Sequence, residues 1–167
     1  MNILFKIKTS SLNQIRDDLG RTHPFAAERV GFVFCRLAEL KPSALVILAH
    51  TFMPVEDGDY LSDTSVGAMM GPGAIRKALQ FAYNNAVGVF HIHLHAHCGI
   101  PRPSRTDLKE TMKFVPDFWH VRPRMPHGAL IVSSDSISGR CWYPGQIAPI
   151  GISQFTFVGS PLVSVRQ

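Results

Sequence analysis

Residues 88–110 read GVFHIHLHAHCGIPRPSRTDLKE, and this stretch decides the fold that we expect. Four of the eight histidines of the chain alternate with apolar or small residues from His91 to His97. Alternation with a period of two is typical of a β-strand, in which positions two apart lie on the same face. A proline-rich loop follows, and Ser104 then has the position of a helix N-cap. The stretch therefore predicts a strand, a loop and a helix, with the histidines on one face of the strand.

The rest of the chain predicts a mixed sheet and further helices around this stretch. The other strands are expected at 1–9, 30–40, 43–55, 129–135 and 139–143, with a final strand at 151–159. The helices are expected at 12–21, from Pro24 through Glu28, at 72–85, and from 105 to about 114. The fold class is therefore α+β, or α/β-like, and we expect residues 1–167 to form a single domain.

Composition and charge exclude several classes of protein. The net charge is +5 and the pI near 9.4, but the charge is diffuse and lacks the basic, aromatic-rich runs typical of nucleic-acid sites. The three cysteines are widely spaced, which argues against a disulfide framework or a cysteine-type zinc site. The longest apolar run is too short to span a bilayer, and no signal peptide is recognisable. We expect a cytoplasmic protein that binds neither nucleic acid nor a membrane.

The histidine run predicts a metal site. Same-face residues two apart on a strand are about 6–7 Å apart, so two imidazoles can converge on one ion. A catalytic zinc site commonly takes three protein ligands and leaves a fourth position for water. Asp107 is the candidate for the third ligand, because it lies in the first turn of the next helix. Ser104 and Asp107 also have the spacing of a helix capping box, and the two roles of Asp107 are compatible.

This combination resembles the JAMM signature of the JAB/MPN metalloproteases. The signature contains a His-x-His strand, then Ser-x-x-Asp at the start of a helix, and upstream a stretch like His-Pro-x-x-Glu-x-x-Gly. The chain has HPFAAERVGFVF, in which His23 and Pro24 are followed by Glu28 and Gly31 with one extra residue before the glutamate. The resemblance extends over most of the chain. It implies a single MPN/JAB domain with a curved mixed sheet flanked by helices, of cytidine-deaminase-like architecture.

The spacing within the signature leaves two ligand pairs open. The usual gap from the second histidine to the aspartate is ten residues, whereas here it is eleven from His95 and nine from His97. We favour His93 and His95, because His97 adjoins Cys98-Gly99, where the strand should already end. The alternative second ligand is His97. In the favoured case, His91 and His97 orient a ligand or meet the substrate.

The resemblance implies a zinc-dependent isopeptidase. His93, His95 and Asp107 would hold Zn²⁺, Glu28 would act as the general base, and Ser104 would hydrogen-bond the oxyanion. The substrate would be an amide or isopeptide bond after the C-terminal tail of a ubiquitin-like protein. Partners of the same pathway would be E1-like and E2-like proteins.

Two other functions are compatible with the same residues. The chain could be a JAB-type hydrolase that acts on a sulfur-carrier protein or a small amide. It could also be an inactive MPN scaffold, which is disfavoured because such versions commonly lack several of these residues. Arg102 and Arg105 flank the expected groove, where we favour a role as solvated loop residues.

Overall fold

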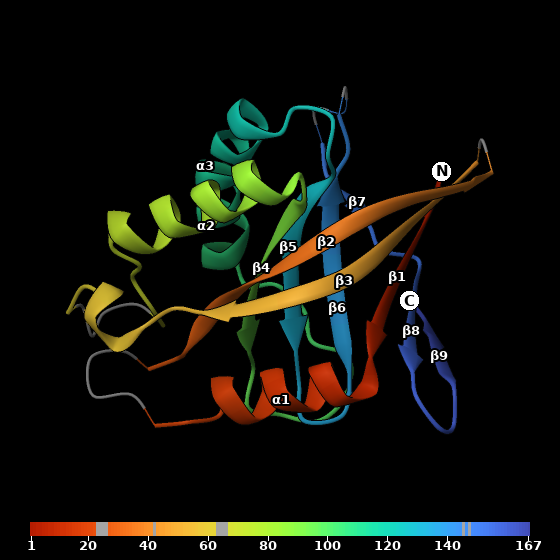
Figure 1. Ribbon diagram of the computed structural model, residues 1–167. Helices are drawn as coiled ribbons and strands as arrows, with labels where there is room; N and C mark the ends of the chain where they lie inside the picture. The colour runs from red at the N-terminus through yellow and green to blue at the C-terminus, as the bar shows by residue number, and fades with distance from the viewer. Residues whose placement is uncertain (23–26, 42, 63–66, 145, 147) are drawn as a thin grey trace.

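The described residues form a nine-stranded sheet with helices on both faces (Figure 1). A computed structural model describes residues 1–22, 27–41, 43–62, 67–144, 146 and 148–167. The helices are α1 (Thr9–Leu19), α2 (Pro72–Asn85) and α3 (Arg105–Val121), with a short 3-10 helix η1 (Asp57–Asp59). The strands are β1 (Asn2–Lys8), β2 (Val30–Lys41), β3 (Ala44–Pro54), β4 (Gly88–Leu94), β5 (His127–Val132), β6 (Ile137–Trp142), β7 (Ile150–Gly151), β8 (Gln154–Val158) and β9 (Val163–Arg166).

The sheet separates two apolar cores. Its strand order is β7-β6-β5-β4-β2-β3-β1-β8-β9, and parallel and antiparallel pairs are mixed. Helix α1 buries Leu12, Ile15 and Leu19 against one face. Helices α2 and α3 lie on the other face, where Ala78 and Phe118 are completely buried (Figure 1). The predicted mixed sheet flanked by helices is therefore confirmed at the level of fold class.

The predicted helices agree with the structure except at three places. Helix α2 has the predicted bounds, and α1 starts three residues before the predicted start at Leu12. Helix α3 continues past the predicted end to Val121 with Pro116 inside it, because Phe114, Val115 and Phe118 are buried in the core. The helix predicted from Pro24 through Glu28 is wrong at residues 27 and 28, which form a bend; its residues 24–26 lie outside the described part.

The predicted strands are confirmed over most of the sheet. Strands β2 and β3 pair antiparallel, and β5 and β6 form the predicted hairpin. The strand predicted at 151–159 corresponds to β8, but β8 starts later than predicted and is not the last strand, since β9 follows. Strand β9 was missed because it has only four residues, so its alternation of valine with polar residues is too short to stand out in the sequence.

Strand β4 lies in the middle of the sheet and determines where the histidines lie. It pairs antiparallel with β2, with Val30 opposite His93, and parallel with β5. Parallel neighbours need a crossover connection, and here that connection contains α3. The N-terminus of α3 therefore follows the carboxyl end of β4, which is the usual place for a ligand site in such units.

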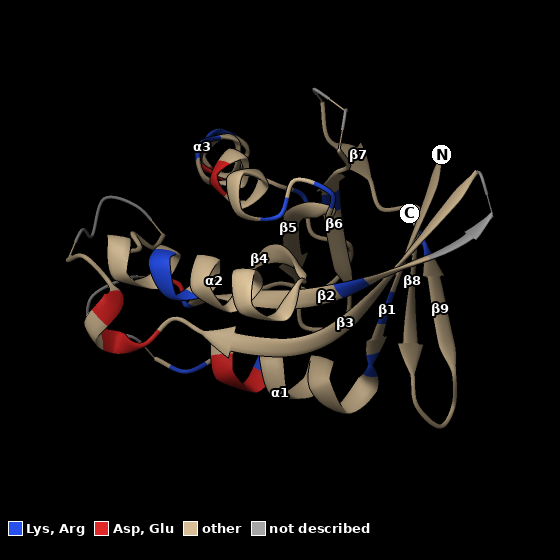
Figure 2. Cartoon of the chain, turned by 45° about the horizontal axis from the view of Figure 1, so that its top comes forward, with Lys and Arg blue, Asp and Glu red and all other residues tan. Residues whose placement is uncertain are grey.

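Among the described residues, no helix is both long enough and apolar enough to span a membrane. Lys and Arg are spread over several elements, including α2, α3 and β2 (Figure 2). The acidic residues of η1 and α1 lie toward one end of the sheet (Figure 2).

His127 links two strands through its buried ring. Its Nδ1 accepts a hydrogen bond from the Val89 N–H at 3.1 Å, and its Nε2 lies 3.0 Å from the Arg122 carbonyl oxygen. The ring is therefore neutral with its proton on Nε2. Burial lowers the pKa of His127 from 6.5 to about 4.

We predict that the free energy of unfolding decreases as the pH falls from 6.5 to 4, because the unfolded chain binds a proton that folded His127 does not. The loss attributable to this residue should approach roughly 3 kcal/mol at the low end. His127→Gln should flatten this slope in urea titrations, whereas His120→Gln, at an exposed position of α3, should not. Equal slopes for wild type and His127→Gln would contradict the prediction.

Candidate metal centre

Strand β4 presents its histidines to the face that α3 covers. His91, His93 and His95 alternate with Ile92 and Leu94, which contact the core on the α1 side. The ring of His91 packs against Phe114 of α3, with 5.1 Å between ring centroids. His93 is only 3% exposed, and His95 follows the end of the strand. The predicted division of the two faces is therefore confirmed as far as Leu94.

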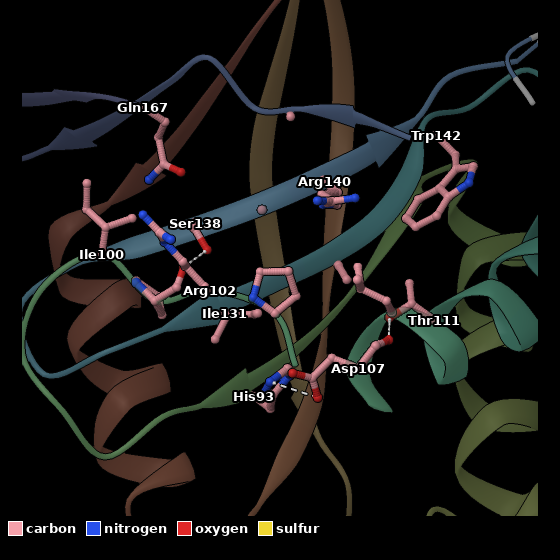
Figure 3. A pocket seen from close by; sticks show the side chains of 16 residues that line it. His93, Ile100, Arg102, Asp107, Thr111, Ile131, Ser138, Arg140, Trp142 and Gln167 are labelled. Carbon is pink, nitrogen blue, oxygen red and sulfur yellow. Dashed lines mark hydrogen bonds and ion pairs between the residues drawn. The ribbon is translucent and has the colours of Figure 1, made fainter. Parts of the chain in front are cut away.

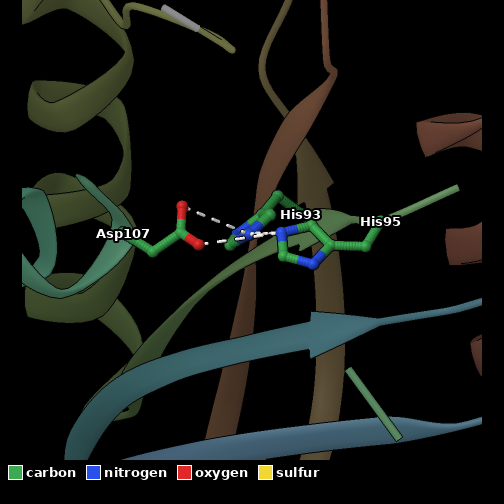
Figure 4. A group of neighbouring side chains, drawn as sticks. All are labelled: His93, His95 and Asp107. Atoms are coloured by element: carbon green, nitrogen blue, oxygen red, sulfur yellow. Dashed lines mark hydrogen bonds and ion pairs between the residues drawn. The ribbon is translucent and has the colours of Figure 1, made fainter. Parts of the chain in front are cut away.

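Asp107 reaches these histidines from the first turn of α3. The Ser104 Oγ accepts a hydrogen bond from the Asp107 N–H at 3.1 Å, and the Asp107 Oδ2 accepts one from the Ser104 N–H at 2.7 Å. This is a complete capping box, as the Ser-x-x-Asp spacing predicts. The same carboxylate faces His93 and His95 (Figure 4). Capping therefore holds a carboxylate beside two imidazoles.

The three side chains have a geometry that fits a metal ion. The Nε2 atoms of His93 and His95 are 3.1 Å apart, and they lie 3.5 and 3.6 Å from the oxygens of Asp107. Ligands at 2.0–2.1 Å from a tetrahedral zinc are about 3.3–3.4 Å apart, so all three separations are close to this value. The group of His93, His95 and Asp107 could therefore bind a metal ion.

The environment of His93 supports this fit. Its Nδ1 is buried and has no hydrogen-bond partner among the described residues. A buried polar atom without a partner is costly, and such atoms concentrate at functional sites. Burial of this unpartnered ring nitrogen therefore marks His93 as a residue of a functional site.

The charge states suit a cation. Burial lowers the pKa of His95, and the neighbouring His93 lowers it further, so the imidazole is neutral and keeps a free lone pair near neutral pH. Burial alone would raise the pKa of Asp107, but hydrogen bonds that the carboxylate accepts from His93 and from the Ser104 N–H outweigh it and lower the pKa overall. The carboxylate is therefore charged across the physiological range.

The two outer histidines lie outside this group. His91 packs between the rings of Phe32 and Phe114, and burial lowers its pKa to about 3. His97 is exposed beyond the strand, and its Nδ1 lies 2.8 Å from the Cys98 carbonyl oxygen. Its ring centroid is 5.9 Å from that of His95. The structure therefore brings together the favoured pair and not the alternative one.

Glu28 lies next to the cluster, although not on the helix that the sequence predicts. It precedes β2 by two residues, and His95 follows His93 by two, so continuing the Val30–His93 register places the two opposite each other. The charge of Glu28 acts to raise the pKa of His95. The Glu28 N–H donates to the Gly67 carbonyl oxygen at 2.8 Å. His23 and Pro24 of the resembling motif lie outside the described residues.

The Glu28 carboxylate lies against Gly67, at a place that a side chain on residue 67 would occupy. A Cβ on residue 67 would come within 2.8 Å of Glu28 Oε2. The close approach explains a glycine at this position, since any side chain would displace the carboxylate.

Arg29 was missed by the sequence analysis and anchors the segment of Glu28. Its buried guanidinium donates to the carbonyl oxygens of Arg21 and Thr22 at 3.1 Å each, and to Asp57 Oδ1 at 2.7 Å. The hydrogen bond with Asp57 raises the pKa of Arg29. An arginine directly before a strongly apolar strand is the only signal in the sequence that could have indicated it.

The loop between β4 and α3 is held by the β5–β6 turn, which the sequence analysis also missed. Ser133 Oγ donates to the Gly99 carbonyl oxygen at 2.7 Å, and the Gly99 N–H donates to Asp135 Oδ1 at 2.7 Å. Ser138 Oγ donates to the Pro101 carbonyl oxygen at 2.6 Å. Gly99 has a φ of +89°, a conformation that favours glycine. These hydrogen bonds therefore fix the loop, and with it the position of the N-terminus of α3 beside the histidines.

Comparison with known proteins adds no family to this geometry. No protein-family model matches the chain, and no curated protein matches it.

We predict that His93→Ala and His95→Ala each weaken Zn²⁺ binding by about 100-fold or more, because each removes a ligand atom. His97→Ala should change the affinity by no more than about tenfold, since its ring lies outside the group. Isothermal titration calorimetry would measure the affinities, and circular dichroism would show that each variant folds. Strong zinc binding by His93→Ala together with loss of zinc binding in His97→Ala would show that the ligands are His95 and His97 instead.

Proposed function

We propose that this protein is a zinc-dependent hydrolase of amide bonds. The observation that carries the proposal is the group of two imidazoles and one carboxylate, at tetrahedral separations, near a second carboxylate, Glu28, just before the neighbouring strand β2. Two imidazoles and a carboxylate are a known catalytic zinc set. The finer assignment to an MPN/JAB domain is part of this proposal, and the helix-flanked mixed sheet supports it.

The residues divide the chemistry between them. His93, His95 and Asp107 would hold the ion, which lowers the pKa of a water molecule toward about 7 and polarises the substrate carbonyl. Glu28 would accept the proton of the attacking water and return it to the leaving amine. Glu28 lies just before β2, near His95 at the end of β4, and this position supports the role.

Ser104 would stabilise the oxyanion. Its Oγ accepts from the Asp107 N–H, so the hydroxyl proton remains available for donation. A hydroxyl donor of this kind typically contributes ~3–4 kcal/mol to transition-state stabilisation. Because Ser104 also caps α3, its side chain is held next to the ion site before the substrate binds.

The resemblance to JAMM proteases favours the C-terminal tail of a ubiquitin-like protein as the substrate, with E1-like and E2-like proteins as partners. The second candidate is a hydrolase of small amides or of a sulfur-carrier protein. An apolar cavity that adjoins His93 and Asp107 favours the small-amide alternative.

Glu28→Gln should retain zinc and lose activity by about 10²–10⁴-fold, because the amide cannot accept the proton. The measurement is cleavage of a panel of ubiquitin-like fusions and N-acylated amino acids by the zinc-loaded protein. Glu110→Gln, on the exposed side of α3, is the matched control and should leave the rate unchanged. A protein that cannot take up stoichiometric zinc would refute the hydrolase proposal, and full activity of Glu28→Gln would refute the role of Glu28.

Gly67→Ala should lower activity by about tenfold or more without changing zinc affinity, since the new methyl group displaces the Glu28 carboxylate. The control is Gly58→Ala, where a Cβ meets no atom within 4 Å. Unchanged rates in both variants would show that the position of Glu28 does not limit the reaction.

A further inference from the structure

A cavity of about 320 Å³ opens directly beside the candidate metal centre (Figure 3). His93 and Asp107 lie at one end of it, and α3 forms one wall. Strands β5 and β6 form the floor. This volume lies at the lower end of the range for small-molecule sites, which is roughly 300–1,000 Å³. The cavity can therefore take a side chain next to the bond being hydrolysed.

The lining of the cavity is mainly apolar. Ile131 and Trp142 are buried in the floor, and Leu108 contributes from α3. Ile100 lines the cavity while 53% of its surface is exposed. An exposed large apolar residue at the mouth of an apolar cavity gains from an apolar ligand that covers it. The lining therefore suits a branched or aromatic group and gives glycine little to contact.

The cavity wall is formed before any ligand binds. Pro101 and Pro103 restrict the backbone of the wall, and the Ser138 hydroxyl fixes the Pro101 carbonyl. Ser133 holds the same loop at Gly99. A preformed wall lowers the entropy cost of binding a small ligand.

Two arginines give the cavity a positive charge. Arg102 and Arg140 both line it, and both are exposed. Neither forms an ion pair or a hydrogen bond with any residue that the structure describes. A guanidinium without a partner beside an apolar cavity is suited to a carboxylate of the ligand.

We infer that the substrates are N-acylated amino acids, or the C-terminal residues of peptides, with a bulky apolar side chain and a free carboxylate. This inference rests on the proposed function. The apolar side chain would occupy the cavity and the carboxylate would meet Arg140 or Arg102. Water would add to the acyl carbon and the C–N bond would break, giving an acid and a free amino acid whose amine takes the proton from Glu28.

Gly151 offers a way to fill the cavity without disturbing the fold. It lines the cavity opposite Arg140 on the edge strand β7, and a Cβ placed there meets no atom within 4 Å. Gly151→Leu therefore adds volume where there is open space. Gly58→Leu is the matched control, since residue 58 also has open space and does not line the cavity.

The test measures binding of N-acetyl-L-phenylalanine, its carboxamide and N-acetylglycine to the full, metal-free chain by calorimetry and by tryptophan fluorescence. Binding of N-acetyl-L-phenylalanine should be about tenfold or more tighter than that of N-acetylglycine, because an aromatic side chain is buried. Loss of the carboxylate in the carboxamide, or Arg102→Ala with Arg140→Ala, should weaken binding by about fivefold or more. Gly151→Leu should weaken binding by about tenfold, and Gly58→Leu should not.

Equal binding of the phenylalanine and glycine compounds by the wild type would overturn the inference, whether or not Gly151→Leu folds. So would zinc-loaded protein that cleaves Gly-Gly tails and ignores the N-acetylated amino acids. Because binding is measured without catalysis, selective binding with no hydrolysis would reject the proposed function and leave the cavity assignment standing.

Discussion

The reciprocal hydrogen bonds between Ser104 and Asp107 are the interaction on which the site depends. They satisfy backbone donors at the start of α3, and they hold the Asp107 carboxylate toward the histidines of β4. The same cap places Leu108 in the wall of the adjoining cavity. Without the cap, the helix would begin elsewhere and the carboxylate would lose its fixed distance from His93 and His95. One local motif thus serves helix stability and site geometry together.

Sheet pairing supplies the second constraint. The antiparallel register of β2 and β4 places Glu28 and His95 at the same end of their strands, while the parallel pairing of β4 and β5 requires a crossover that contains α3. Two carboxylates from distant parts of the chain, Asp107 and Glu28, therefore both lie near His95. Arg29 ties the segment of Glu28 to the residues after α1 and to η1, and the turn containing Ser133 holds the loop before α3. The site is therefore built from a strand and a helix, and hydrogen bonds of buried side chains hold the loops beside it.

The sequence predicted elements well where local signals and burial agree. Helix α2 has a proline start and an apolar stripe, and its predicted bounds hold. Helix α3 runs through Pro116 because three buried side chains around it outweigh one lost hydrogen bond, which composition cannot show. Residues 27 and 28 are bent because Arg29 and Gly67 hold them, although their local sequence favours a helix. The choice between the pairs His93/His95 and His95/His97 was likewise open in the sequence, because the spacing to Asp107 does not show which histidines its carboxylate faces.

The sequence by itself determined the alternating histidine strand, the capped helix with Asp107, and the mixed character of the sheet, because periodicity and capping are local properties. The tertiary structure selects His93 and His95, rather than His97, as the neighbours of Asp107, because the end of β4 at Leu94 and the course of the loop depend on pairing with β5 and its turn. It also decided the place of Glu28 and the cavity beside the histidines. These features arise between segments far apart in the chain, where no local pattern can record the distances.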